Sequence, residues 1–430
     1  MKVLMFGWEF PPHISGGLGT ACYGLTKGLS RHNDLEVLFV VPKAFGDEDK
    51  SAAHIIGASD VYINQKKINI KGFLKEVNMI EVNSTLIPYT DLDEYYNIIQ
   101  KYNLHNNKNV VKSDFEGRFN FSGGYGPMLF NEIYNYSLVA SMLASEHSFD
   151  IIHAHDWLTY PAGIVAKEIS GKPLVIHVHA TDFDRSGGNV NPRVFEIEKR
   201  GMEVADKIIT VSNWTRDIVI NKYGINPNKV VTVYNAVEPL NEAETSRYEK
   251  YLDDKIVTFL GRITMQKGPE YFIEAARKVL NRMDNVRFVM AGSGDMMNKM
   301  VLRVAQLGIA NRFHFTGFLA GDDVNNMYAL SDVYVMPSVS EPFGISPLEA
   351  IRSNVPVIIS KQSGVAEVLN HAIKVDFWDI DALADAIYGI LNYPALSKMF
   401  KTYGKEEVDN LKWENSADHV RAIYYQTISA

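Results

Sequence analysis

Short apolar runs alternate with segments of helical periodicity along most of this chain, and this alternation restricts the possible folds more than any other feature. Short aliphatic runs bounded by turns are typical of buried parallel strands. We expect such strands at residues 2–7, 35–42, 149–157, 173–182, 207–215 and 229–237, and again at 255–261, 286–292, 313–317, 332–337, 355–360 and 373–377. The sequence therefore predicts an α/β protein with two doubly wound, Rossmann-like parallel sheets.

The length of the chain and one polar segment predict two domains. A chain of 430 residues is too long for one ordinary core. Residues 239–254 are charged and weakly periodic, and we expect them to link an N-terminal domain, residues 1–238, to a C-terminal domain, residues 255–410. The two domains are expected to face one another across a cleft. A terminal helix within residues 411–430 is expected to pack back on the N-terminal domain.

Residues 44–148 interrupt the alternation with a long, aromatic-rich insertion. Two interpretations of its aromatic side chains remain open. They fill a core, or some of them stack on sugar rings at an acceptor site, with Phe121 and Tyr125 as the candidates.

Composition and charge exclude several classes of function. The chain has 46% apolar and 22% charged residues, which is typical of soluble globular proteins. Its net charge of −8 argues against nucleic acid and against anionic lipid as partners. The single cysteine, Cys22, excludes a disulfide framework and a cysteine zinc site. The sequence has neither a signal peptide nor an apolar run of about 20 residues that could span a membrane, so we expect a cytoplasmic protein.

Glycines and polar residues gather where the predicted strands end, which is where parallel sheets bind ligands. Gly16 and Gly17 stand between the first strand and its helix, where backbone N–H groups can approach a phosphate. Two neighbouring strands end in four histidines and two aspartates: His153, His155, Asp156, His177, His179 and Asp182. A lone histidine in a strand usually belongs to a core, but this number of polar residues favours a site.

The C-terminal half carries two cations just beyond its first strand, Arg262 and Lys267. A guanidinium fork and an ammonium group together can neutralise a leaving diphosphate. The alternative is a solvated basic loop. The diphosphate interpretation is favoured because further anion-binding features are expected at the same edge of the sheet.

The stretch 338–350, SVSEPFGISPLEA, supplies those features. It follows a strand and begins a helix, and it carries Glu341 in the loop and Glu349 in the first helical turn. Ser346 to Glu349 predict a capping box with proline at the first helical position. The start of this helix offers N–H groups and a positive dipole end to an anion or to sugar hydroxyls. The alternative is that Glu349 only caps its helix and Glu341 is a solvated loop charge.

The chain resembles the retaining GT-B glycosyltransferases (glycosyl transferases group 1) in four motifs and in their order. These motifs are the GGL turn at 16–18, HAHDW at 153–157, GRITMQKG at 261–268 and SEPFGISPLEA at 340–350. This family contains bacterial glycogen and starch synthases, sucrose-phosphate synthases and many lipid-linked sugar transferases. The resemblance covers essentially the whole chain.

The resemblance implies a role for each matching residue. Arg262 and Lys267 would bind the diphosphate of a nucleotide sugar, Glu341 would lie against the donor sugar, and Glu349 would hold the ribose hydroxyls. His155, with Asp156 beside it, would face the donor sugar; strand alternation places His153 on the same face, so the choice between the two histidines stays open. The rest of the donor site would comprise Gly16, Gly17, Gly292, Gly344, Ile345 and Ser346, and the acceptor side would include His179 and Asp182.

The resemblance also implies a reaction, the transfer of glucose from ADP-glucose or UDP-glucose to the 4-hydroxyl of an α-1,4-glucan or oligosaccharide, as in a glycogen synthase. One departure weakens that assignment, because Ile14-Ser15 stand where bacterial glycogen synthases usually have a lysine before the paired glycines. Alternatives are a small-sugar, sugar-phosphate or lipid-linked acceptor, a sugar-nucleotide 2-epimerase, and a non-catalytic glucan-binding protein. We expect no cofactor and no metal, although Asp91 and Asp93 form a D-x-D triplet of the kind that some sugar transferases use for a divalent ion.

Overall fold

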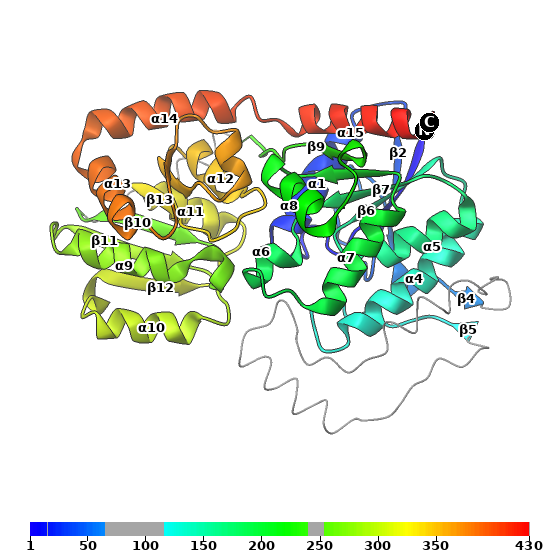
Figure 1. Cartoon of the computed structure of the whole chain (residues 1–430), viewed down its shortest axis with the longest axis horizontal. Coiled ribbons are helices and arrows are strands. Elements are labelled where there is room, and N and C mark those ends of the chain that lie inside the picture. Colours follow the sequence, from blue (N-terminus) through cyan, green and yellow to red (C-terminus); the bar gives the residue numbers. More distant parts are fainter. Residues whose placement is uncertain (15, 65–115, 240–252, 430) are drawn as a thin grey trace, which may run out of the picture.

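The computed structural model describes residues 1–14, 16–64, 116–239 and 253–429, and these form two parallel sheets covered by helices on both faces (Figure 1). The seven-stranded sheet has the order β3-β2-β1-β6-β7-β8-β9 and the six-stranded sheet the order β12-β11-β10-β13-β14-β15. In each sheet the strand order reverses beside the first strand, which creates the crevice where doubly wound folds bind ligands. The predicted fold class is confirmed.

The first sheet consists of β1 (Lys2–Phe6), β2 (Glu36–Val41), β3 (His54–Gly57), β6 (Ile151–His155), β7 (Leu174–Val178), β8 (Lys207–Thr210) and β9 (Val230–Thr232). Its helices are α1 (Gly17–Leu29), α4 (Leu129–Glu146), α5 (Tyr160–Ser170), α6 (Asp182–Ser186), α7 (Pro192–Val204) and α8 (Asn213–Tyr223). The short strands β4 (Ile63–Asn64) and β5 (Glu116–Gly117) pair with each other.

The second sheet consists of β10 (Lys255–Leu260), β11 (Val286–Ala291), β12 (Phe313–Gly317), β13 (Val333–Met336), β14 (Val357–Ser360) and β15 (Ile373–Val375). Its helices are α9 (Pro269–Leu280), α10 (Met297–Gln306), α11 (Asp322–Leu330), α12 (Ser346–Arg352), α13 (Ile380–Asn392) and α14 (Pro394–Val408). The last helix, α15 (Trp413–Ile428), lies beside the first sheet (Figure 1).

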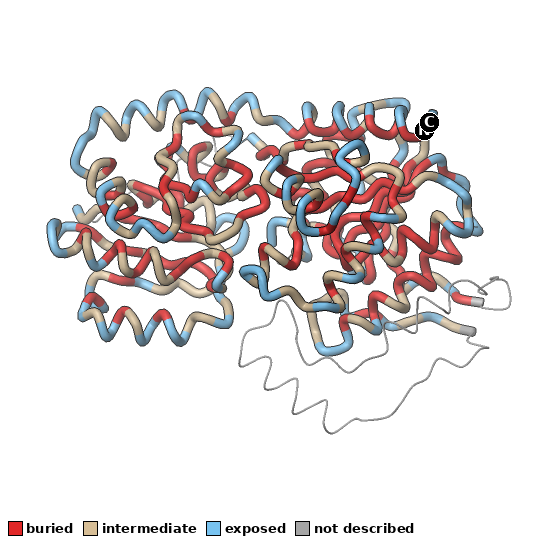
Figure 2. The backbone as a smooth tube through the Cα atoms, viewed as in Figure 1, coloured by how far each residue is buried: buried red, intermediate tan, exposed pale blue. Residues whose placement is uncertain are grey.

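The strands are buried on both faces because apolar residues occupy every position rather than alternate ones (Figure 2). In β1, Leu4 and Phe6 belong to the apolar cluster beneath α4 and α5, while Val3 and Met5 belong to the cluster beneath α1 and α15. The α15 helix thus completes the core of the first sheet.

Two glycines allow α15 to approach α1 closely. A Cβ atom added at Gly24 would lie 2.2 Å from the Trp413 ring, and one at Gly28 would lie 2.8 Å from the Ala417 Cβ atom. Any larger residue at either position would therefore push the two helices apart.

The segment predicted as an insertion contributes to the core at both ends. Its β3 strand pairs with β2 and extends the sheet, which the sequence did not predict. At the other end, the Tyr136 hydroxyl on α4 lies 2.7 Å from the Val40 carbonyl oxygen of β2. Residues 65–115, with Asp91 and Asp93, lie outside the described residues.

Candidate active site

Lys267 and Glu341 meet at the carboxyl edge of the second sheet. The Lys267 Nζ donates a hydrogen bond of 2.5 Å to Glu341 Oε2, and the Ser338 hydroxyl donates one of 3.1 Å to the same oxygen. The two loops come together because β10 and β13, which precede them, are neighbours in the sheet. The sequence placed both residues at one site, and the structure brings them into contact.

Arg262 lies in the same loop as Lys267, and its Nη2 is 3.5 Å from Gln266 Oε1. A glycine beside this loop allows a close approach of two strand ends. Gly292 has φ +138°, and a Cβ atom there would lie 1.9 Å from the Gly261 carbonyl oxygen. Gly292 therefore keeps the end of β11 against the loop that carries Arg262.

The predicted capping box at α12 is wrong. The helix begins one residue earlier than expected, so Ile345 is the N-cap residue, Ser346 is the first helical residue, and no side chain caps the helix. Gly344 has φ +97°, which explains the glycine before the helix. Burial raises the pKa of Glu349, and the nearby Arg352 opposes this shift.

The glycine turn of the N-terminal half begins α1 at Gly17, with Gly16 as its N-cap. A Cβ atom added at either glycine would meet nothing within 4 Å, so the backbone here borders open space. Leu18 of this turn and Ile345 of the loop before α12 pack against the same apolar cluster. The turn and the Glu341 loop therefore both lie at the contact between the two halves.

Four histidines form a stack under α1 and α15. His153 and His155 point to one face of β6, and the register pairs His155 with His177 of β7. Adjacent ring centroids lie 4.2 Å apart for His153 and His155 and 4.3 Å apart for His177 and His179. Burial lowers the pKa of each of the four, that of His153 to about 3, so all four imidazoles are neutral near neutral pH.

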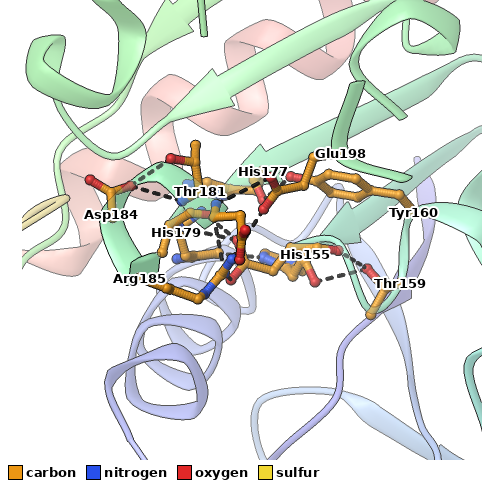
Figure 3. Close-up of polar contacts among 12 residues, drawn as sticks. His155, Thr159, Tyr160, His177, His179, Thr181, Asp184, Arg185 and Glu198 are labelled. Atoms are coloured by element: carbon orange, nitrogen blue, oxygen red, sulfur yellow. Dashed lines mark hydrogen bonds and ion pairs between the residues drawn. The ribbon is translucent and has the colours of Figure 1, made fainter. Parts of the chain in front are cut away.

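Asp156 is a buried carboxylate. It belongs to the group of polar contacts around Arg185 and Glu198, which are labelled in Figure 3. It has φ +60°, and its Oδ1 accepts hydrogen bonds of 2.8 and 3.2 Å from the N–H groups of His179 and Ala180. Its Oδ2 is 3.2 Å from Arg185 Nη2, and Arg185 Nη1 is 3.0 Å from Glu198 Oε1. These contacts fix the loop between β7 and α6.

Sequence reasoning missed Arg185 and Glu198. Glu198 lies on α7 in the stretch EIEKR, which looks like a solvated helix face, yet it is 1% exposed. It is bonded to the Arg185 guanidinium, to the Tyr223 hydroxyl and to the Asp182 N–H group. The helical periodicity gives one indication of this burial, because Glu198 lies four residues after the buried Val194 and therefore on the same face of α7.

Four residues that were predicted to contact sugars are buried in this structure. His155 is 0% and Asp156 is 3% exposed, so neither side chain faces a donor sugar in this structure. Phe121 is 2% exposed and packs edge-on against Tyr136 in the core, which leaves no ring face for a sugar. Asp182 is also buried, and its Oδ2 accepts a hydrogen bond from the Asn191 N–H group. Tyr125 is partly buried against the same core as Phe121.

The buried Glu198 predicts a pH dependence of stability. Burial raises its pKa from 4.5 to about 7, so the folded chain holds this proton more tightly than the unfolded chain does. Its contribution to the free energy of unfolding should therefore fall as pH rises from about 4.5 to about 7, by at most about 1.4 kcal/mol per pH unit.

Urea denaturation of the wild type and of Glu198→Gln across this pH range measures the contribution of Glu198. The difference between their unfolding free energies at each pH is the quantity to compare. The exposed Glu196→Gln on the same helix is the control and should give a constant difference. A pH-independent difference for Glu198→Gln would contradict the prediction.

The two halves of the chain are held together by direct hydrogen bonds. The Ser340 hydroxyl, next to Glu341, donates to Asp184 Oδ1 at 2.5 Å, and the Ser212 hydroxyl donates to the Pro342 carbonyl oxygen at 2.5 Å. Glu367 of the C-terminal half accepts from the N–H groups of Asn213 and Trp214 at 2.9 and 2.7 Å. Glu367 thereby supplies the carboxylate that α8 needs at its positive end.

Among the described helices, none is both long and apolar enough for a membrane span.

Comparisons with known proteins agree with this architecture. Residues 241–407 match the model of glycosyl transferases group 1, and residues 117–239 match the model of glycosyltransferase family 4. An uncharacterized glycosyltransferase of Methanocaldococcus jannaschii is 28% identical over 99% of this chain and 98% of its own length. The glycogen synthase of Mycobacterium tuberculosis is 21% identical over 99% of this chain and 94% of its own.

Solved structures show the same fold. The sucrose-phosphate synthase of Thermosynechococcus elongatus has a TM-score of 0.70 at 17% identity, covering 100% of this chain and 99% of that one. HepE of Anabaena, solved in complex with UDP-glucose, has a TM-score of 0.67 at 15% identity, covering 99% of this chain and 100% of that one. With both halves matched by family models and the whole chain by the fold, this protein belongs to the GT-B glycosyltransferases of group 1 and family 4.

Proposed function

We propose that the chain transfers glucose from ADP-glucose or UDP-glucose to the 4-hydroxyl of an α-1,4-glucan, with retention of configuration, as a glycogen synthase does. The observation that carries this proposal is the contact between Lys267 and Glu341 at the edge of the second sheet, in which Lys267 shares its loop with Arg262. Similarity over the whole chain to a glycogen synthase, and the fold shared with a protein solved with UDP-glucose, support it.

The diphosphate would bind between Lys267, Arg262 and the N–H groups of Gly16 and Gly17. The Lys267 ammonium group has three protons, so it can keep its bond to Glu341 while donating to a phosphate oxygen. Glu341 would then lie beside the sugar that the diphosphate carries, and Glu349 would hold the ribose. Glycines 292 and 344 and the backbone of Ile345 and Ser346 would shape the wall of this site.

In the transfer step, the bond between the anomeric carbon and the phosphate oxygen breaks, and a bond to the acceptor oxygen forms on the same face. The departing phosphate oxygen takes the proton of the acceptor hydroxyl, so the step needs no strong base on the protein. Negative charge builds up on the phosphate as the bond breaks. Arg262 and Lys267 should therefore act mainly by stabilising the transition state.

The acceptor side would be the loop between β7 and α6, with His179 at its start. His155 and Asp156 would support this loop from below, because His155 Nδ1 lies 2.9 Å from His179 Nε2 and Asp156 binds the loop backbone. A small sugar, a sugar phosphate or a lipid-linked sugar is the second candidate acceptor. The burial of Phe121 favours it, since it removes one of the two aromatic rings expected to stack on a glucan.

Domain closure provides a prediction for donor affinity. Glu367→Ala removes the carboxylate that joins the C-terminal half to the start of α8, so the closed arrangement becomes less populated. A hydrogen bond to a charged group contributes about 1.5–3 kcal/mol, which corresponds to roughly a tenfold or larger change in an equilibrium. We expect the KM for the nucleotide sugar to rise by about tenfold.

The exposed Glu406→Ala on α14 is the matched control and should leave the KM unchanged. An unchanged KM for Glu367→Ala in steady-state kinetics would show that this contact does not control closure.

The proposed function is tested by incubating the full chain with ADP-glucose, UDP-glucose and other nucleotide sugars, with and without maltooligosaccharides or glycogen. Mass spectrometry and NMR of the products then give the sugar, the linkage and the anomeric configuration. Extension of the glucan by α-1,4-linked glucose is expected. Turnover only with a small or lipid-linked acceptor would replace the glucan assignment. An isomeric sugar nucleotide formed without an acceptor would overturn transfer itself.

A further inference from the structure

We infer that His153, His155 and His177 bind one divalent transition-metal ion of the Zn²⁺ class inside the N-terminal half. This site would be structural, and it is separate from the diphosphate site. The inference does not depend on the proposed function.

The backbone brings the three imidazoles together. His153 and His155 are two residues apart on β6 and therefore share one face of the sheet, and His177 is the cross-strand neighbour of His155 on β7. One ring nitrogen from each of the three residues lies within 4.8 Å of the others.

The spacing of the rings fits a tetrahedral ion. Zinc binds imidazole nitrogen at about 2.0–2.1 Å, which places the centroids of two bound rings about 5 Å apart. The three observed centroid distances are 4.2 Å for His153 and His155, 5.5 Å for His153 and His177, and 5.3 Å for His155 and His177. The interplanar angles of these pairs are 34°, 8° and 28°, so the rings would have to rotate to direct three nitrogens at one ion.

The hydrogen bonds of these residues leave at least one ring nitrogen of each unused. His153 Nδ1 lies 2.6 Å from the Tyr424 hydroxyl, and His155 Nδ1 lies 2.9 Å from His179 Nε2. The Nε2 atoms of His153 and His155 and both ring nitrogens of His177 are buried and have no hydrogen-bond partner within the described part of the chain. Buried polar atoms are normally paired, so four such atoms in one cluster point to a missing partner.

This pattern is the one that metal-binding histidines adopt. A ligating histidine usually presents one nitrogen to the metal and donates a hydrogen bond from the other, which fixes its tautomer and orientation. With Nε2 on the ion, the Nδ1–H of His153 would donate to Tyr424, and the Nδ1–H of His155 would donate to His179. Tyr424 belongs to α15, so the ion would also stabilise the packing of the C-terminal helix on the first sheet.

The ligand set defines the class of ion. Imidazole nitrogens suit Zn²⁺ and its transition-metal neighbours, whereas Mg²⁺ and Ca²⁺ require oxygen ligands, which this trio lacks. Cys22, His155 and His179 form a second, overlapping trio. We favour the all-histidine trio, because binding at the other would compete with the existing hydrogen bond between His155 and His179.

The test is the metal content of the full chain, produced without an affinity tag in zinc-supplemented medium. Elemental analysis by mass spectrometry should find about one zinc per chain in the wild type and in the control variant His419→Gln, whose histidine is exposed on α15. It should find almost none in His177→Gln. Removing the ion with a chelator should lower the melting temperature, and adding Zn²⁺ back should restore it. Co²⁺ in its place should give the visible absorption of a tetrahedral site.

A wild-type chain without zinc, and without a thermal shift on adding Zn²⁺, would overturn the inference, as would a folded His177→Gln that keeps its zinc. Should His177→Gln not fold, Tyr424→Phe serves instead. This variant removes only the partner of His153 and should weaken zinc affinity by roughly 10- to 100-fold in competition with a coloured chelator. UDP-glucose binding measured on the same samples separates the zinc site from the proposed sugar transfer. A chain that contains no zinc but still binds UDP-glucose would contradict the zinc site and leave the proposed function intact.

Discussion

Replacing Lys267 with alanine is expected to lower kcat by about 10²–10³-fold while the chain stays folded. The Lys267 ammonium group is the cation bonded to Glu341, and its side chain is 21% exposed, so a ligand can reach it. If a diphosphate leaves from this site, the ammonium group contributes most when the negative charge develops. The loss should therefore appear in kcat more than in the KM for the donor.

Lys278→Ala is the matched control for this experiment. Lys278 also pairs with a carboxylate of the C-terminal half, Asp381, but on the exposed side of α9. Steady-state transfer and the slower hydrolysis of the sugar nucleotide should both fall in Lys267→Ala and stay unchanged in Lys278→Ala. Near-normal turnover of Lys267→Ala, with unfolding behaviour equal to the wild type, would remove Lys267 from the reaction.

Replacing Arg185 with alanine is expected to lower the free energy of unfolding by about 3–5 kcal/mol. The Arg185 side chain is 6% exposed and lies between two carboxylates, those of Asp156 and Glu198, which are 5% and 1% exposed. Without the guanidinium, both carboxylates remain buried, and no other ion pair within the described part of the chain neutralises them. Urea denaturation at neutral pH measures the loss.

A second variant and a change of pH make the Arg185 experiment specific. Arg421→Ala removes an arginine that pairs with Asp34 at the surface, where ion pairs contribute little, and should change stability far less. Lowering the pH should restore part of the stability of Arg185→Ala, because Glu198 then becomes neutral. Equal losses of stability in the two variants, or no recovery on acidification, would contradict the role of Arg185 in neutralising the buried Asp156 and Glu198.

The strands and their ends could be predicted from the sequence because both depend on local patterns. Continuous apolar runs identified the two parallel sheets, and polar residues at strand ends predicted which edge of the sheets binds a ligand. The proximity of Lys267 and Glu341 could be predicted for the same reason, because the loops that follow neighbouring parallel strands lie at one edge of the sheet.

The histidines show what local patterns leave open. Strand alternation placed His153 and His155 on one face, which the structure bears out, but it could not indicate what covers that face. The cover is α15, which supplies Tyr424 from 271 residues away. The burial of Phe121 and Asp156 could not be predicted for a similar reason, because it depends on α4 and on Arg185 rather than on their neighbours in sequence.

The return of α15 to the first sheet has a consequence for biosynthesis. When roughly the first two hundred residues leave the ribosome, the sheet face with Val37 and Phe39, together with Cys22 of α1, still lacks Trp413 and Tyr424. That apolar surface stays uncovered until α15 has been synthesised. Shortening the chain before α15 should accordingly yield insoluble material even though every strand of both sheets is retained.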